Sequence, residues 1–120
     1  MAKTDIQIAL IRGDGIGVDV SDAALALVDA ALQKTGQAAF SYREIDAGAG
    51  YFQETGRDIE PGGEEAAGSA DAIFLGAIGL PSIRHADGTE ISPHLRLRDI
   101  YQLYAGVRPV RAYPNAPQRL

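Results

Sequence analysis

Four polar residues in the last third of the chain have types and spacing that suit binding of an acidic small molecule. Ser92, His94 and Arg98 lie close together, and Arg108 follows ten residues after Arg98. In a helix, Arg98 lies one turn after His94 near the same face, and Arg108 could turn toward it from the next segment. Two converging arginines bind a di- or tricarboxylate through paired charged hydrogen bonds. The alternative, which spacing alone favours, is an exposed basic helix whose arginines pair with the acidic first half of the chain.

A glycine-rich turn near the N-terminus is a second candidate. Residues 13–17 (Gly-Asp-Gly-Ile-Gly) lie between an apolar run and a helical pattern, where the amides of a helix terminus can meet an anion. The spacing does not match the dinucleotide fingerprint G-x-G-x-x-G, and no lysine followed by serine or threonine completes a phosphate-binding loop. Two interpretations stay open: an anion site, or a tight turn in which Asp14 bonds to its neighbours.

Charge is distributed unevenly along the 120 residues. The formal net charge is −5, which argues against nucleic-acid binding. Residues 84–120 nevertheless hold six arginines and no lysine, and arginine suits bidentate binding of carboxylates. The three acids of this segment, Asp87, Glu90 and Asp99, do not form a convincing metal-ligand set, and we expect His85 to be solvated.

Alternating apolar and helical patterns predict an α/β fold. We expect strands at 6–11, 39–45 and 71–79, the first and third buried in a parallel sheet. A helix of about five turns should end at Gly36, and short helices should follow within 46–63 and from Glu64. The loop at 80–92 leaves the carboxyl end of the third strand, the edge at which open α/β sheets bind ligands.

The segment after that loop combines a helix start signal with a later stop signal. Ser92 is a plausible N-cap and Pro93 a plausible first helical residue, so we expect a helix of about three turns before Gly106. Its apolar positions are predicted at Leu95, Leu97, Ile100, Leu103 and Tyr104. Residues 107–114 should be extended, because each residue before a proline is pushed out of helical geometry.

Composition limits the cellular setting of the protein. The chain has no cysteine, which removes disulfides and thiolate chemistry. No apolar stretch approaches the length needed to span a bilayer, and the N-terminus lacks a signal-peptide pattern. We therefore predict a cytoplasmic protein with no membrane partner.

Three motifs together resemble one enzyme family. Residues 9–17 (ALIRGDGIG), 74–81 (FLGAIGLP) and the pattern LR-x4-LYA-x-VRP at 97–109 resemble, in the same order, the β-decarboxylating dehydrogenases of isocitrate, 3-isopropylmalate and related 2-hydroxy acids. The resemblance implies an open layered sheet with flanking helices rather than a Rossmann fold, present here as an incomplete domain. It implies that 1–106 form the first part of a large cofactor and substrate domain, and that 107–120 begin the crossover into a second domain.

The resemblance also implies an activity and its partners. A 2-hydroxy acid would be oxidised with NAD or NADP, and its 3-carboxylate would then leave as CO2 with the help of Mg2+ or Mn2+. Isopropylmalate, isocitrate and tartrate all remain possible substrates. The acid-base and metal-binding residues would lie beyond Leu120, so no catalytic or metal residue is expected here and the chain alone should be inactive. The remainder of the polypeptide and a second copy, in a homodimer, are the implied partners.

Individual residue roles follow from matching positions in the resemblance. Arg98 and Arg108 would grip substrate carboxylates, Ser92 would lie next to substrate and nicotinamide, and His94 would face the variable group of the substrate. The implied cofactor-binding residues are Ile16, Ala77, Ile78, Gly79 and Glu90. The alternative from a different class is a small α/β module that binds an anion at residues 13–17 or takes part in assembly, without catalysis.

Overall fold

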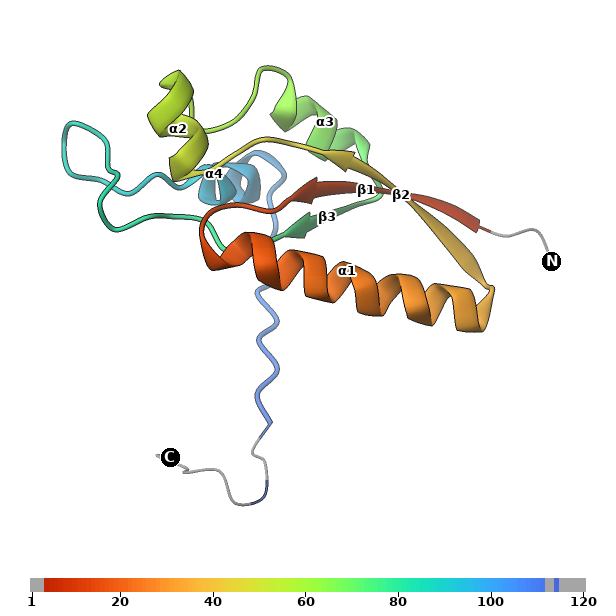
Figure 1. Ribbon diagram of the computed structural model, residues 1–120. Coiled ribbons are helices and arrows are strands. Elements are labelled where there is room, and N and C mark those ends of the chain that lie inside the picture. The colour runs from red at the N-terminus through yellow and green to blue at the C-terminus, as the bar shows by residue number, and fades with distance from the viewer. Residues whose placement is uncertain (1–3, 112–113, 115–120) are drawn as a thin grey trace.

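A three-stranded parallel sheet forms the centre of the computed structural model, which describes residues 4–111 and 114 (Figure 1). β1 (Thr4–Ile11) lies between β2 (Ala38–Glu44) and β3 (Ala72–Leu75). β1 pairs with β2 along most of its length and with β3 only through its last four residues. The predicted parallel α/β arrangement is confirmed, and the carboxyl ends of all three strands meet at one edge.

Helices cover both faces of this sheet. α1 (Ile16–Thr35) lies along one face and ends at Gly36, whose left-handed backbone confirms the predicted cap. α2 (Ala49–Thr55) and α3 (Gly63–Ser69) lie on the other side of the sheet in Figure 1. Both short helices fall where the sequence predicted them.

The apolar core lies mainly between the sheet and the helices opposite α1. Ala9 and Ile11 of β1 contribute to it, because alternate residues of a strand face the same side. Buried residues from the later segments complete the cluster: Ile45, Ala47, Ile59, Ala67 and Leu97. Toward α1, the side chains of Ile8 and Leu10 are also buried, so the second half of β1 is covered on both faces as predicted.

The third strand is shorter and more exposed than predicted. It ends at Leu75, whereas the apolar run continues to Gly79. The amide of Gly76 still donates to the Ile11 carbonyl, but the next carbonyl, of Ala77, accepts from Asp14, which draws the chain away from the ladder. Leu75 is 42% exposed because β3 has no neighbour on its outer side among the described residues. The prediction of a long, fully buried third strand was therefore wrong.

The last helix is also shorter than predicted. α4 (Pro93–Ile100) makes about two turns, because Gln102 adopts a left-handed backbone and the amide of Leu103 folds back onto the Arg98 carbonyl. Leu103 and Tyr104 therefore lie beyond the helix and are exposed, as are Leu95 and Ile100. Of the five apolar positions predicted for this helix, only Leu97 is buried.

The segment after α4 leaves the body of the protein, as Figure 1 shows. Residues 103–111 form no helix or strand, in line with the predicted extended segment. Residues 112–113 and 115–120 lie outside the described residues, and with them most of the predicted crossover at 107–120. The domain boundary at residue 106 stays a prediction. Among the described residues no helix is long and apolar enough to cross a membrane.

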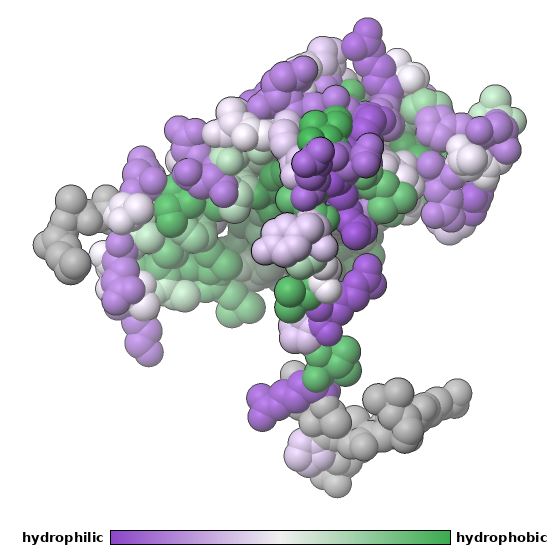
Figure 2. All heavy atoms as spheres, turned by 180° about the vertical axis from the view of Figure 1, so that it is seen from behind, coloured by the Kyte–Doolittle hydropathy of each residue, from purple (hydrophilic) through white to green (hydrophobic). Residues whose placement is uncertain are grey.

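Apolar side chains gather on one face of the surface. Figure 2, which views the molecule from behind, shows a broad green area to the left of the segment that leads toward the C-terminus. Several large apolar side chains are exposed on α1, β3 and that segment, among them Val20, Leu27, Leu75, Val107 and Val110.

Candidate functional site

β3, α4 and the segment after it line a cavity of about 290 Å³, which we call the arginine cavity. Its basic residues are His94, Arg98 and Arg108. The other lining residues are apolar or small: Ile73, Leu75, Leu97, Leu103, Ala105, Gly106 and Val107. The structure thus brings together three of the four residues predicted to bind substrate, beside the outer strand β3.

Local geometry explains why these basic groups converge. Pro93 begins α4 and is buried, and Leu97 is buried in the core, so the helix is held on one side. His94 and Arg98 lie one turn apart and both reach the cavity. Arg108 reaches it because the chain passes the same cavity again after the helix has ended.

No acidic residue is among the described residues that line the arginine cavity. Burial, followed by the charge of Arg98, lowers the pKa of His94 below its usual value, so the imidazole favours its neutral form. His94 Nδ1 is buried and has no hydrogen-bond partner among the described residues. Within residues 4–111 and 114 no acid forms an ion pair with Arg98 or Arg108. A carboxylate ligand would supply the missing charge and acceptors.

Arg96, between the two cavity residues of α4, has a different role. Its guanidinium donates two hydrogen bonds to Asp58, at 2.7 and 3.0 Å, and a third to Glu64. These bonds raise the pKa of Arg96, and the bond from Arg96 is the main cause that lowers the pKa of Asp58. Tyr101 adds an anchor, donating its hydroxyl proton to the Glu64 carbonyl at 2.6 Å. For Arg96, the interpretation that arginines of this helix pair with the acidic first half is confirmed.

Ser92 lies between two cavities along the chain. It occupies the N-cap position of α4 as predicted, but its hydroxyl makes no capping hydrogen bond. Its neighbour Ile91 lines a second cavity, described next, and His94 lines the arginine cavity. The proposed contact of Ser92 with both substrate and nicotinamide stays a prediction.

The loop after β3 surrounds this second cavity of about 190 Å³, the loop cavity. Three of the predicted cofactor residues, Ile78, Gly79 and Glu90, line it. The remaining lining residues are Leu80, Pro81, Ile83, Arg84 and Ile91. Arg84 and Glu90 form an antiparallel bridge and an ion pair at 3.1 Å, which closes the loop at its base. The structure therefore gathers part of the predicted cofactor set around one cavity.

The other two predicted cofactor residues lie outside the loop cavity. Ala77 does not line it, and its carbonyl accepts the Asp14 amide at 2.7 Å. Ile16 begins α1 and is 69% exposed. A role for these two residues at the cofactor stays a prediction.

The carboxylate of Asp14 joins the three segments that follow the three strands, and we call this cluster the Asp14 junction. Asp14 follows β1, is 7% exposed, and accepts hydrogen bonds from the amides of Ala49 and Gly50, both at 2.8 Å, at the start of α2. It also accepts from the Gly79 amide, at 2.7 Å, in the loop after β3. A side chain at Gly48 would meet this carboxylate at 2.5 Å, so the close approach requires glycine.

This junction decides between the two interpretations of residues 13–17. The backbone amides that converge beside the turn already donate their hydrogen bonds to the carboxylate of Asp14, so they are not available to an external anion. The amides of Gly17 and Val18 donate to the carbonyls of Asp14 and Gly15 within the turn. The tight-turn interpretation is confirmed, and the alternative of a small anion-binding module is not favoured.

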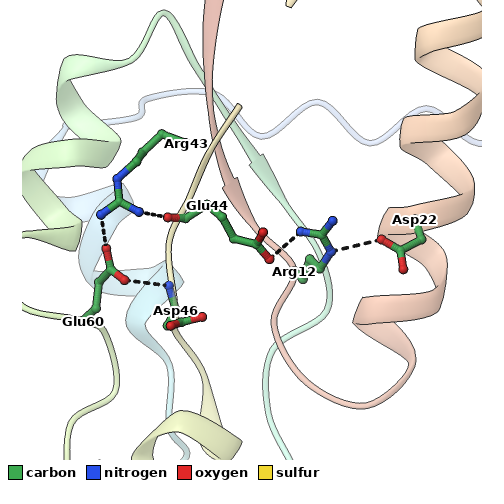
Figure 3. Close-up of polar contacts among 6 residues, drawn as sticks. All are labelled: Arg12, Asp22, Arg43, Glu44, Asp46 and Glu60. Atoms are coloured by element: carbon green, nitrogen blue, oxygen red, sulfur yellow. Dashed lines mark hydrogen bonds and ion pairs between the residues drawn. The ribbon is translucent and has the colours of Figure 1, made fainter. Parts of the chain in front are cut away.

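Two arginines near the ends of β1 and β2 hold the neighbouring elements together (Figure 3). Arg12 donates to Asp22 of α1 at 3.0 Å and to the side chain of Glu44 at 2.5 Å. Arg43 donates to the Glu44 carbonyl and to Glu60, and Glu60 also accepts the amide of Asp46. These contacts are half-exposed and tie the sheet edge to α1 on one side and to the loop before α3 on the other.

His85 is less solvated than predicted. Its ring is half-buried and packs edge-on against Phe52 of α2, with 5.0 Å between ring centroids. The loop at 80–92 thus rests on α2, which sequence reasoning missed because nothing in the local pattern links residues more than thirty positions apart. The same limit hid the three distant partners of the Asp14 carboxylate, which come from two segments.

Comparison with known proteins gives one consistent result. A family model described as isocitrate/isopropylmalate dehydrogenase matches residues 7–119. The chain is 38% identical to a 3-isopropylmalate dehydrogenase of Bifidobacterium longum, over 100% of this chain and 34% of that protein. It is 31% identical to a decarboxylating D-malate dehydrogenase of Escherichia coli, over 98% of this chain and 32% of that protein.

A solved structure agrees with these sequence relatives. The crystal structure of a β-decarboxylating dehydrogenase from Thermococcus kodakarensis, in its apo form, superposes with a TM-score of 0.62 at 35% identity. The match covers 82% of this chain and 27% of that one. The chain spans about a third of the length of the curated relatives it matches.

Proposed function

The chain belongs to the isocitrate/isopropylmalate dehydrogenase family, and from this premise we propose that it is the N-terminal portion of an NAD(P)-dependent enzyme that oxidatively decarboxylates a malate-like 2-hydroxy acid. One observation carries the proposal. His94, Arg98 and Arg108 converge on one cavity beside β3, the outer strand of the sheet, and the two arginines have no ion-pair partner among the described residues.

Arg98 and Arg108 would bind and orient the substrate through its carboxylates. Two fixed cations hold a dicarboxylate in one orientation, which places the carbon that is oxidised at a defined distance from the cofactor. His94, neutral at physiological pH, would contact the variable group of the substrate, which is an isopropyl group in isopropylmalate and is absent in malate.

The loop cavity would hold part of the nicotinamide cofactor. Its apolar surface at Ile78, Leu80 and Ile83 suits a flat aromatic ring, and the Glu90 carboxylate can accept hydrogen bonds from ribose hydroxyls. When bound, the cofactor supplies the acceptor for the hydride that leaves the substrate carbon. In the proposed enzyme, Mg2+ or Mn2+ would be held by residues outside this segment. Among the described residues, no group of three or more histidine, aspartate or glutamate side chains could hold a metal ion.

The substrate class is tested by measuring NAD+ and NADP+ reduction by the intact protein. D-malate, 3-isopropylmalate, isocitrate and tartrate should be compared, because similar proteins are named for the first two. Arg98→Ala and Arg108→Ala should each lower kcat/KM about 10- to 100-fold, the equivalent of one charged hydrogen bond. Arg57→Ala, at an exposed arginine outside the arginine cavity, is the matched control. If Arg98→Ala and Arg108→Ala kept the kcat/KM of the unaltered protein, as Arg57→Ala is expected to do, the proposal would be contradicted.

A further inference from the structure

The position of the loop cavity depends on a residue that does not line it. Residues 77–79 form the part of the loop nearest to β3, and Ile78 and Gly79 line the cavity. Asp14 is absent from the lining and lies behind this segment. It nevertheless contacts the segment at two points, one through its backbone and one through its side chain.

Those two contacts fix the backbone on both sides of Ile78. The amide of Asp14 donates to the Ala77 carbonyl, and the amide of Gly79 donates to Asp14 Oδ2, each at 2.7 Å. A three-residue segment that is held at both ends retains little freedom for the residue between them. Asp14 therefore fixes the position and orientation of the backbone at residues 77–79, of which Ile78 and Gly79 line the loop cavity.

The same carboxylate is anchored at its other side by α2. The amides of Ala49 and Gly50 donate to Oδ2 and Oδ1, so both oxygens are engaged and the side chain cannot rotate without breaking a bond. A buried carboxylate with three amide donors forms charge-assisted hydrogen bonds, which are stronger than bonds between neutral groups. If residues 77–79 of the loop move, the start of α2 must therefore move with them or lose a hydrogen bond to Asp14.

We propose that Asp14 is a positioning residue that sets the affinity for the nicotinamide cofactor through the backbone of residues 77–79, without touching the cofactor. The proposal rests on the proposed function of the loop cavity. It predicts a coupling that simple contact would not produce: the start of α2 should respond to the cofactor, although Ala49 and Gly50 do not line the loop cavity.

The first test uses the unaltered intact protein and amide hydrogen exchange. Adding NAD+ or NADP+ should slow exchange at Gly79, Ala49 and Gly50 together, by about tenfold at a cofactor concentration ten times its Kd. Slower exchange at Gly79 alone would overturn the proposal. Failure of both cofactors to bind would contradict the proposed function and the cofactor role of Asp14 with it.

The second test replaces one acceptor oxygen with a donor in Asp14→Asn. Because the negative charge and one acceptor are lost, exchange at the three bonded amides should accelerate, the Kd for the cofactor should rise about tenfold, and the KM for cofactor should rise more than kcat falls. Asp22→Asn is the matched control, since Asp22 is a half-exposed acid on α1 that bonds only to Arg12 among the described residues.

The outcomes of the second test are separable. Unchanged exchange at all three amides, those of Ala49, Gly50 and Gly79, would overturn the positioning role whatever the protein catalyses. Faster exchange at Gly79 with an unchanged cofactor Kd would overturn the link to the cofactor and leave the substrate proposal intact. If Asp14→Asn does not fold, the exchange experiment on the unaltered protein decides the question by itself.

Discussion

The Asp14 junction and the arginine cavity differ in whether their charged side chains have partners within the protein. Asp14 is buried, and three amides from two distant segments satisfy its carboxylate. Arg98 and Arg108 share a cavity with the neutral His94, and neither arginine has an ion-pair partner among the described residues. A charge whose partners are all within the chain stabilises structure, whereas cations gathered without a partner are arranged for a ligand. The Asp14 junction therefore supports the structure, whereas the arginine cavity is arranged to bind a ligand.

The largest effect is expected at the Asp14 junction. Asp14→Ala should lower the free energy of unfolding by about 3–5 kcal/mol, because it leaves three amides without their acceptor in a buried place. Denaturant-induced unfolding measures the loss. Asp22→Ala should cost about 1 kcal/mol or less, because its ion pair with Arg12 is half-exposed. Equal losses in the two variants would remove the distinction between the regions.

The next effect concerns binding rather than stability. The double variant Arg98→Ala with Arg108→Ala should unfold within about 0.5 kcal/mol of the unaltered protein, since both side chains are exposed and lack ion pairs among the described residues. It should lose the rise in Tm that we expect D-malate or another substrate acid to cause in the unaltered protein. Retention of that rise would show that the carboxylates bind elsewhere.

A variant of Arg96 tests whether an arginine of α4 stabilises the fold or binds substrate according to the helix face on which it lies. Arg96→Ala should lower the free energy of unfolding by about 1 kcal/mol, because it breaks a half-exposed network with Asp58 and Glu64. The KM for substrate should not change, because Arg96 does not line the arginine cavity. A KM that rises as in Arg98→Ala would contradict the assignment of the two faces.

The smallest effect is the pH dependence contributed by His94. Because the folded protein lowers the pKa of His94, the unfolded chain binds this proton more readily. The contribution of His94 to stability is therefore present above the unfolded value of about 6.5 and is lost as pH falls toward the lower folded pKa. His94→Asn should flatten stability over this window, as measured by unfolding at several pH values.

A titration sharpens the same comparison. Removing the neighbouring charge in Arg98→Ala should raise the pKa of His94, but only in part, because burial is the larger cause of its lowering. The imidazole signals in an NMR titration would report this change. A His94 pKa that does not move would mean that Arg98 and His94 do not share an electrostatic environment.

Local patterns in the sequence were sufficient for the elements of the fold. The apolar run of β1, the helical spacing of α1 and the cation-glycine end at Gly36 each act within a few residues, so they could be predicted. The lengths of β3 and α4 could not. β3 ends where Asp14 draws Ala77 away, and α4 ends where Gln102 adopts a left-handed backbone that its residue type does not demand.

The candidate site shows the same division. The sequence by itself determined which residues carry charge, that His94 and Arg98 share a helix face, and which family the motifs resemble. Only the tertiary structure decided that Arg108 joins them, that Arg96 turns instead to Asp58, and that Asp14 holds Gly79. The physical reason is distance along the chain: Asp14 and Gly79 are 65 positions apart. Their contact exists only once the sheet has brought the ends of its strands together.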